Sequence, residues 1–249
     1  MNRQQEGVSI GPDEKLEDLQ RCNLKIIQSK NTFRFGFDAV LLADFATVKK
    51  GDRVLDLGTG NGIIPLLLAG KKEPALIHGL EIQPRLVDMA QRSVAINGLE
   101  GLIKIIPGDL RCPPAQLLAG KYDLVVSNPP YLPAGGKLNP CLELAIARHE
   151  ILCSLADVIK TGAQMARFRG RLALIHRPGR LVDLLGILRQ QGLEPKVIRF
   201  VHSTIKSPPA MVMVEAVKGG RPHVQVLPPL AIYDQEGQYT ADIMDIYNE

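Results

Sequence analysis

Apolar and polar positions alternate along this chain in blocks typical of an α/β protein. Near-continuous apolar runs separate stretches in which an apolar residue recurs every three or four positions. The apolar runs predict strands over 24–28, 53–58, 75–82, 103–107, 122–127 and 171–176. The helical spacing predicts helices over 37–48, 62–71, 84–97, 113–119, 144–169 and 180–191, and the acidic segment 12–21 predicts a further short one. Because strands and helices alternate, we expect a doubly wound, mostly parallel sheet covered on both faces.

The last two predicted strands, 196–203 and 211–218, follow each other with no helix between them. This arrangement predicts an antiparallel pair, and hence an antiparallel edge strand on a seven-stranded sheet. The length of 249 residues suits one domain with short additions. We therefore expect an N-terminal extension over 1–30 with a short helix and a strand, an α/β domain over 31–218, and a C-terminal tail over 219–249 packed on the domain.

Composition narrows the class of protein further. Hydrophobic residues make up 45% and charged residues 22% of the chain, as in globular proteins, and no apolar run approaches the roughly 20 residues that span a bilayer. The polar N-terminus lacks the apolar core of an export signal. The cysteines, Cys22, Cys112, Cys141 and Cys153, form no CxxC pair. We expect a cytoplasmic protein with reduced thiols, no bound metal and no membrane contact, either a monomer or a weak dimer.

Charge is distributed unevenly along the chain, whose net charge is +4. Residues 160–223 hold 12 Lys and Arg against 3 Asp and Glu, whereas residues 224–249 hold 5 acids and no Lys or Arg. A basic segment of this kind is typical of a surface that binds RNA or DNA. It is equally typical of a solvated face without a partner, and charge alone does not choose between the two.

The first long strand ends in a glycine-rich loop, "DLGTGNG" at residues 56–62. Three glycines allow a tight strand-to-helix turn and a close approach of a ligand to the backbone. The spacing is not the G-x-G-x-x-G of dinucleotide-binding loops, and no Gly-Lys-Ser/Thr follows as in a P-loop. Asp56 would repel a pyrophosphate and favour a cationic or amine-bearing ligand.

Acidic residues follow at the ends of the next two predicted strands. Glu81 comes 25 residues after Asp56, where its carboxylate can accept both hydroxyls of a ribose, and Asp109 ends the third strand, where it can accept from an adenine amino group. Because the carboxyl ends of parallel strands meet at one edge of a sheet, these features converge on one site. The set fits S-adenosylmethionine.

The fourth strand ends in "NPPY", Asn128 to Tyr131, at the same edge. Neither proline has an N–H group, so the turn offers carbonyl and amide oxygens but few donors. Two acceptors, the Asn128 side chain and the Pro129 carbonyl, can hold the two hydrogens of an exocyclic amine. Pro130 and the flat ring of Tyr131 can contact a planar substrate, and stacking on an aromatic ring contributes about 1–3 kcal/mol per base.

At these motifs the chain resembles class I S-adenosylmethionine-dependent methyltransferases that act on amino groups, which implies their Rossmann-like fold. Segments along most of the chain resemble more narrowly the bacterial tRNA1(Val) adenine(37) N6-methyltransferase family: "IIQSKNTFRFGFDAVLLADFA" (26–46), "TGNGIIPLLLAG" (59–70), "IARHEI" (146–151), "HRPGRL" (176–181), "KGGRP" (218–222) and "LPPLAIYDQEGQYT" (227–240). The resemblance implies methylation of N6 on adenine 37, in the anticodon loop of a tRNA. It also implies that Phe37 and Asp38 line the cofactor pocket.

The expected site residues follow from the motifs and from this resemblance. The expected catalytic residues are Asn128, Pro129 and Tyr131. Expected to bind the cofactor are Phe37, Asp38, Asp56, Gly58, Thr59, Gly60, Asn61, Gly62, Glu81, Ile82, Asp109, Leu110 and Asn128. Expected to bind the substrate are Pro130, Tyr131, Arg177, Arg180 and Lys206, the last three through RNA phosphates.

Other functions remain open on the sequence alone. A guanine N2-methyltransferase of ribosomal RNA, a glutamine N5-methyltransferase of a release factor and a DNA adenine methyltransferase would all use a similar turn. A non-catalytic RNA-binding protein with the same fold is a further alternative. The short segment before the core disfavours the release-factor enzyme, which carries a helical N-terminal domain, and the chain has little room for a DNA recognition domain.

Overall fold

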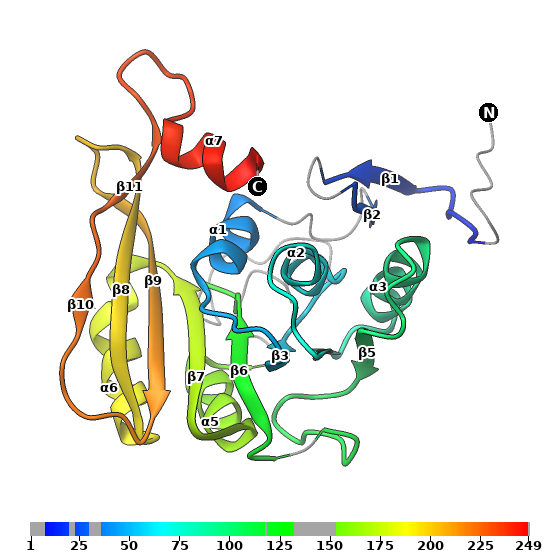
Figure 1. The fold of residues 1–249 in the computed structure, drawn as a ribbon, viewed down its shortest axis with the longest axis horizontal. Coiled ribbons are helices and arrows are strands. Elements are labelled where there is room, and N and C mark those ends of the chain that lie inside the picture. The colour runs from blue at the N-terminus through cyan, green and yellow to red at the C-terminus, as the bar shows by residue number, and fades with distance from the viewer. Residues whose placement is uncertain (1–7, 20–22, 30–35, 118, 132–152, 249) are drawn as a thin grey trace.

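The computed structural model describes residues 8–19, 23–29, 36–117, 119–131 and 153–248 (Figure 1). Its strands are β1 (Glu14–Asp18), β2 (Lys25–Ser29), β3 (Arg53–Leu57), β4 (Leu76–Glu81), β5 (Ile103–Pro107), β6 (Tyr122–Ser127), β7 (Ala166–His176), β8 (Leu193–Thr204), β9 (Pro209–Lys218), β10 (Gln225–Val226) and β11 (Leu230–Tyr233). Its helices are α1 (Phe37–Phe45), α2 (Ile63–Lys71), α3 (Pro84–Ile96), α5 (Leu155–Met165), α6 (Leu181–Gln190), α7 (Ala241–Asn248) and the short 3₁₀ helix η1 (Pro178–Arg180).

One large sheet, with strand order β10-β8-β9-β7-β6-β3-β4-β5, runs through the described residues. Strands β5, β4, β3, β6 and β7 pair in parallel, and β9 runs antiparallel to both β7 and β8. The expected doubly wound, mostly parallel α/β sheet with an antiparallel hairpin is therefore confirmed. The antiparallel strand lies between β7 and β8, however, and not at the edge.

The sheet is also wider than the seven predicted strands. The C-terminal tail returns along β8, where β10 and β11 pair with it in parallel and give nine strands within the described chain. These short strands bond to backbone groups of β8 that an edge strand would otherwise leave unpaired.

Helices cover both faces of the sheet. Neighbouring strand residues point to opposite faces, so Val54 packs in the core cluster with α1, α2 and α3, whereas Leu55 packs with α5 and α6. Figure 1 shows α1, α2 and α3 on one side of the sheet and α5 and α6 on the other. The loops that follow β3, β4, β5 and β6 therefore open together at one edge.

The predicted N-terminal helix over 12–21 is wrong, because residues 14–18 of this segment form β1. It pairs antiparallel with β2 in a separate two-stranded sheet, and Leu16 packs beside Ile27 against α3. Both carboxylate oxygens of Glu14 accept hydrogen bonds from Arg92 of α3, each at 2.8 Å. Pairing with β2 and docking on α3 together outweigh the helical preference of an isolated acidic segment.

Two other predicted helices differ from the structure. The described residues within 113–119 form turns, in which the Leu117 N–H donates to the Pro114 carbonyl at 2.9 Å. The helix predicted over 144–169 is shorter: α5 spans Leu155–Met165, β7 already begins at Ala166, and residues 144–152 lie outside the described residues.

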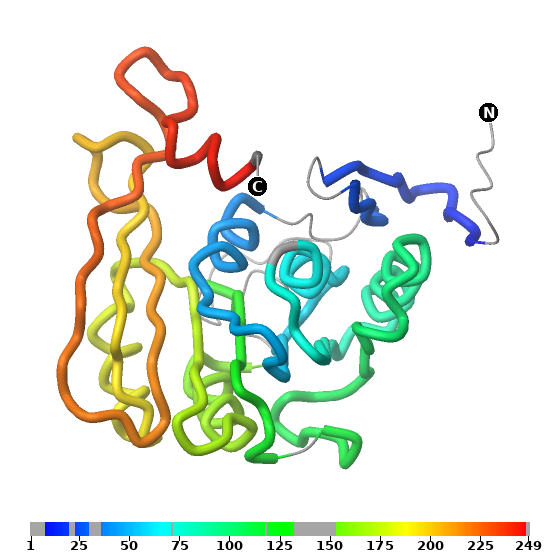
Figure 2. The backbone as a smooth tube through the Cα atoms, viewed as in Figure 1, coloured from blue at the N-terminus to red at the C-terminus, as the bar shows by residue number. Residues whose placement is uncertain are grey.

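The C-terminal tail closes back onto the start of the domain. Figure 2 follows it along β8 and then over to α1. Ile243 and Ile246 of α7 are buried in the core cluster that also contains α1 and α2. No helix in the described part of the chain is long and apolar enough to cross a membrane.

Candidate active site

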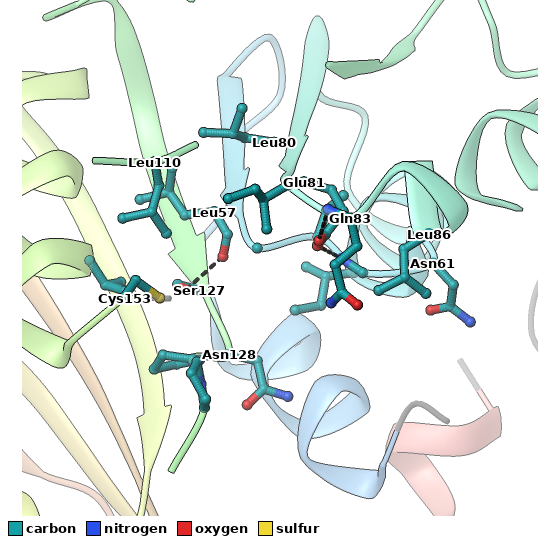
Figure 3. Close-up of a pocket in the computed structure, with 18 of the residues that line it drawn as sticks. Leu57, Asn61, Leu80, Glu81, Gln83, Leu86, Leu110, Ser127, Asn128 and Cys153 are labelled. Carbon is teal, nitrogen blue, oxygen red and sulfur yellow. Dashed lines mark hydrogen bonds between the residues drawn. The ribbon is translucent and has the colours of Figure 1, made fainter. Parts of the chain in front are cut away.

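A cavity opens at the carboxyl ends of β3, β4, β5 and β6, the edge at which the motifs were expected to meet. Most of the predicted cofactor and catalytic residues line it, together with Pro130 of the predicted substrate site: Gly58, Thr59, Gly60, Asn61, Glu81, Ile82, Asp109, Leu110, Asn128 and Pro129. Figure 3 shows Glu81, Leu110 and Asn128 around this cavity, each from the end of a different strand. Parallel strands place successive loops side by side, which is why residues so far apart in sequence share one wall.

The glycine loop is held in shape by Glu81. Gly60 lies in the left-handed region at φ 59°, and its N–H donates to one Glu81 carboxylate oxygen at 2.9 Å. The Gln83 N–H donates to the other oxygen, also at 2.9 Å. A residue with a side chain is strained at this φ, and a Cβ on Gly60 would stand in open space where a ligand can approach. Each carboxylate oxygen keeps a second lone pair for a ligand hydroxyl.

Asp56 occupies a different position from the other predicted cofactor residues. It is fully buried at the end of β3 and does not line the cavity. Burial raises the pKa of Asp56 to about 7, repulsion from Glu81 adds to this rise, and the Thr59 side chain partly opposes it. Burial likewise raises the pKa of Glu81, against the effect of its backbone hydrogen bonds. Beside the glycine loop, one carboxyl group, that of Glu81, therefore faces the cavity, and a second, that of Asp56, is buried away from it.

Asp109 is already engaged by a neighbour. The Arg111 N–H donates to one of its oxygens at 2.8 Å, and the Arg111 guanidinium contacts the other at 2.5 Å. These hydrogen bonds lower the pKa of Asp109, so it is ionised at neutral pH. An incoming amino group would share this carboxylate with Arg111.

The turn after β6 supplies acceptors to the cavity. The Ser127 hydroxyl donates to the Leu57 carbonyl at 2.7 Å and ties the end of β6 to β3 (Figure 3). Asn128 and Pro130 are half-buried and Pro129 is buried, all three on the cavity wall. Since two successive prolines bring no N–H group, this stretch of wall presents oxygens.

Tyr131 ends the described part of this turn and does not line the cavity. Its hydroxyl donates to Asp38 of α1 at 2.7 Å and also contacts the Asn128 side chain. His176, at the end of β7, meets the Tyr131 ring edge-on with centroids 5.4 Å apart. The Arg177 guanidinium lies over the same ring at 5.3 Å from its centroid.

His176 is fully buried, and burial lowers its pKa to about 4. The ring is therefore neutral at physiological pH. Because Nδ1 accepts from the Arg177 N–H at 2.8 Å, the ring proton is on Nε2. His176 thus supports Tyr131 and Arg177 as an uncharged packing group.

The other predicted site residues lie around the cavity at different distances from its wall. Phe37 packs against two aromatic rings of the tail, with ring centroids 6.1 Å from Tyr239 and 5.5 Å from Tyr247. Gly62, in the left-handed region at φ 87°, is the N-cap of α2. Neither residue lines the cavity.

The predicted phosphate-binding residues lie in exposed segments after β7 and β8. Arg177 precedes η1 and Arg180 is its last residue, and Lys206 is exposed in the loop between β8 and β9. Arg180 makes an ion pair with Asp183 at 2.9 Å, so its charge is partly neutralised. Arg177 is the basic residue in contact with the Asn-Pro-Pro-Tyr turn.

The sequence reasoning missed lining residues in the first turns of helices. Gln83 and Leu86 line the cavity from the start of α3, and Cys153 lines it just before α5. For Cys153 the sequence does contain a signal, because Ser154 and Asp157 have the spacing of a capping box. In the structure they form one, with Ser154 as the N-cap of α5. Of the cysteines, Cys112 and Cys153 lie within the described residues, and neither forms a disulfide there.

Several known proteins are similar to this chain. It is 30% identical over 188 residues to a tRNA1(Val) (adenine(37)-N6)-methyltransferase of Parabacteroides distasonis, covering 75% of this chain and 77% of that protein. The enzyme of the same name from Pedobacter heparinus is 28% identical over 87% of this chain and 90% of its own length. The match to the one from Porphyromonas gingivalis, 34% identical, spans 64% of each chain, just under two thirds of the relative's length.

Solved structures share the fold at lower identity. The crystal structure of a predicted O-methyltransferase from Agrobacterium tumefaciens matches with a TM-score of 0.69 at 21% identity, covering 85% of this chain and 96% of that one. An S-adenosylmethionine-dependent methyltransferase from Aquifex aeolicus matches with a TM-score of 0.52 at 18% identity, covering 73% and 90%. Residues 23–152 match the methyltransferase small domain, a model that covers more than half of the chain. With a glycine loop, a strand-end glutamate and an acceptor-rich turn on one cavity, the chain belongs to the methyltransferase small domain family and is an S-adenosylmethionine-dependent methyltransferase.

Proposed function

We propose that this enzyme methylates the exocyclic N6 of an adenine in tRNA, with adenine 37 of tRNA1(Val) as its substrate. The observation that carries the proposal is the shared cavity: the acceptors of Asn128 and Pro129 lie on the same wall as Glu81 and the glycine loop. The relatives from three genera that carry the tRNA1(Val) adenine(37) name support the choice of base and RNA.

The residues present fit the cofactor. Glu81, braced by two backbone N–H groups, would accept the ribose hydroxyls, and Gly58 and Gly60 leave room for the ligand beside the backbone. Ile82 and Leu110 supply apolar walls for a flat base, and Asp109 would accept from its amino group. S-adenosylmethionine supplies an electrophilic methyl group on a positively charged sulfur.

The Asn-Pro-Pro turn would act on the substrate amine by positioning it. The lone pair of an adenine amino group is delocalised into the ring, so the nitrogen is a weak nucleophile. When the Asn128 side-chain oxygen and the Pro129 carbonyl each accept one of its hydrogens, the nitrogen can become tetrahedral and direct its lone pair at the methyl carbon. The same oxygens stabilise the positive charge that develops on nitrogen.

The surroundings of the turn suit a nucleic acid. A base that leaves the stack of an anticodon loop would enter beside Pro130 and Tyr131, which is less costly from a single-stranded loop than from a duplex. Arg177 and Lys206 are exposed and would contact phosphates of the RNA, and Arg180 would do so after exchanging its partner Asp183 for a phosphate.

The test is methyl transfer from labelled S-adenosylmethionine to unfractionated tRNA that lacks the modification, followed by nucleoside analysis. We expect N6-methyladenosine in a valine tRNA, and loss of transfer in Asn128→Ala with cofactor binding unchanged. Label in N2-methylguanosine or in ribosomal RNA alone would overturn the substrate. Label only in release factors would overturn RNA as the partner, and binding without any transfer would support the non-catalytic alternative.

A second test addresses the basic residues near the turn. If Arg177 and Arg180 contact phosphates, the double variant Arg177→Ala/Arg180→Ala should bind tRNA more weakly and show a shallower slope of log affinity against log salt, by about one unit per lost contact. The matched control is Arg167→Ala/Arg169→Ala, an equal charge change at the other end of β7. Equal slopes in both double variants would contradict the assignment.

A further inference from the structure

The Tyr131 hydroxyl lies between two side-chain oxygens, one of Asp38 and one of Asn128. It donates to Asp38 Oδ2 at 2.7 Å, and it is also in contact with the side-chain oxygen position of Asn128. A phenol has one proton and can donate one full hydrogen bond. With a carboxylate on one side, the hydroxyl cannot also satisfy an amide oxygen on the other.

The conflict disappears if the Asn128 amide is rotated by half a turn about its Cβ–Cγ bond, so that its oxygen and its NH₂ group exchange places. The NH₂ group then donates to the Tyr131 oxygen, and the Tyr131 hydroxyl donates to the Asp38 carboxylate. The two orientations have almost the same shape, so the hydrogen-bond network decides between them. In the satisfied network the Asn128 oxygen faces away from Tyr131 and is free to accept from a ligand.

We propose that Asp38 is a positioning residue, which acts through the Tyr131 hydroxyl to fix the Asn128 amide with its NH₂ toward Tyr131 and its oxygen toward the substrate amine. This inference rests on the proposed function, because it concerns how Asn128 accepts from that amine. It differs from the expectation that Asp38 contacts the cofactor, since Asp38 does not line the cavity.

The surroundings hold each member of this chain of hydrogen bonds in place. The other Asp38 oxygen accepts from the Ala39 N–H at 3.0 Å, at the start of α1. The Tyr131 ring is held by the edge contact with His176 and by Arg177. Burial and the nearby Asp38 carboxylate raise the pKa of Tyr131 well above its ordinary value, so the phenol keeps the proton that it donates.

A double-mutant cycle tests the proposal in the full-length protein, with Asp38→Asn, Tyr131→Phe and the two combined. An amide at position 38 can donate to the Tyr131 oxygen, which lets the hydroxyl donate to Asn128 and turns the Asn128 NH₂ toward the substrate. We expect Asp38→Asn to lower kcat about 10-fold or more, with KM for S-adenosylmethionine unchanged. In the Tyr131→Phe background, Asp38→Asn should have no further effect, because its action passes through the missing hydroxyl.

Controls separate this role from structure and from cofactor binding. Asp44→Asn makes the same charge change on α1 two turns away and should leave kcat at the wild-type value. Thermal unfolding and calorimetric binding of S-adenosylmethionine report on folding and on the cofactor pocket. Additive effects of Asp38→Asn and Tyr131→Phe, or a rise in the cofactor Kd with kcat unchanged, would overturn the proposal.

A second measurement does not depend on turnover. In nuclear magnetic resonance spectra, with the Asn128 side-chain amide assigned by comparison with Asn128→Ala, one of its protons should be protected from solvent exchange. That protection should be lost in Tyr131→Phe and in Asp38→Asn. Unprotected amide protons in the wild type would refute the orientation. Absence of methyl transfer by the wild-type protein would refute the proposed function but leave this measurement intact.

Discussion

Removal of the Glu81 carboxylate should weaken cofactor binding far more than it weakens the fold. In Glu81→Ala the N–H groups of Gly60 and Gln83 both lose acceptors at 2.9 Å. Both residues are half-buried on the cavity wall, so water can reach the freed donors and each loss costs less than the roughly 1–3 kcal/mol of a fully buried donor. The loss is partly offset because burial already raises the pKa of Glu81, which means that its charge is costly in the folded protein. In the bound state the variant would also lose two hydrogen bonds from ribose hydroxyls to a carboxylate, at about 1.5–3 kcal/mol each.

Even the lower end of this range, about 3 kcal/mol for two bonds, corresponds to a Kd for S-adenosylmethionine raised by at least about 100-fold. Calorimetric titration measures the change, and urea unfolding without ligand measures the smaller loss of stability. Glu81→Gln, which keeps one carbonyl oxygen, should be intermediate. Glu100→Ala, the loss of an exposed carboxylate from the turn after α3, should bind as the wild type does. A folded Glu81→Ala protein that binds within about twofold of the wild type would refute the role assigned to this residue.

Two further predictions concern buried charges. The pKa of Asp56 is raised from 3.8 to about 7, so the folded state binds the Asp56 proton more tightly than the unfolded state does. Protonated Asp56 therefore stabilises the fold. This contribution is complete below about pH 4 and is lost as the pH rises through 7. Urea titrations measure the free energy of unfolding of the wild type and of Asp56→Asn at each pH. The wild-type value minus the variant value should fall by roughly 2–3 kcal/mol between pH 5 and pH 8. A difference that stays constant over this range would contradict the prediction. Arg171 and Asp52 form a buried ion pair at 2.5 Å, so Arg171→Met should cost about 3–5 kcal/mol in urea unfolding, and adding Asp52→Asn should recover part of that loss. A loss below about 1 kcal/mol would show that the pair contributes little.

The same ion pair shows why the basic segment could not be interpreted from its composition. Arg171 lies inside residues 160–223, yet its guanidinium is buried against Asp52 and is not available to a polyanion. Arg180 pairs with Asp183, whereas Lys206 is exposed in a loop. A count of charges along the chain treats these residues alike, and only their partners in space distinguish them.

Local signals were sufficient where the chemistry is contained in one short stretch. The glycine loop, Glu81 and the Asn-Pro-Pro turn each follow a strong apolar strand, and parallel strands bring such loops to one edge whatever the rest of the chain does. The sequence therefore predicted the core strands along the chain and most of the cavity wall.

Structure that depends on a distant partner was not predictable in this way. Residues 14–18 have the composition of a helix but form a strand because β2 and α3 supply its hydrogen bonds and its apolar contacts. The tail adds strands to β8 for the same reason. The contact of Asp38 with Tyr131 joins residues 93 positions apart.

The sequence by itself thus determined the α/β core, the cavity edge and most of the residues expected to reach it, because local hydrophobic periodicity and turn chemistry are properties of short segments. The tertiary structure alone decided which charges are paired, which side chains meet Asn128 and how β1 and α7 pack on the core. Each of these depends on a free energy of contact between segments far apart in the chain, which no single segment carries.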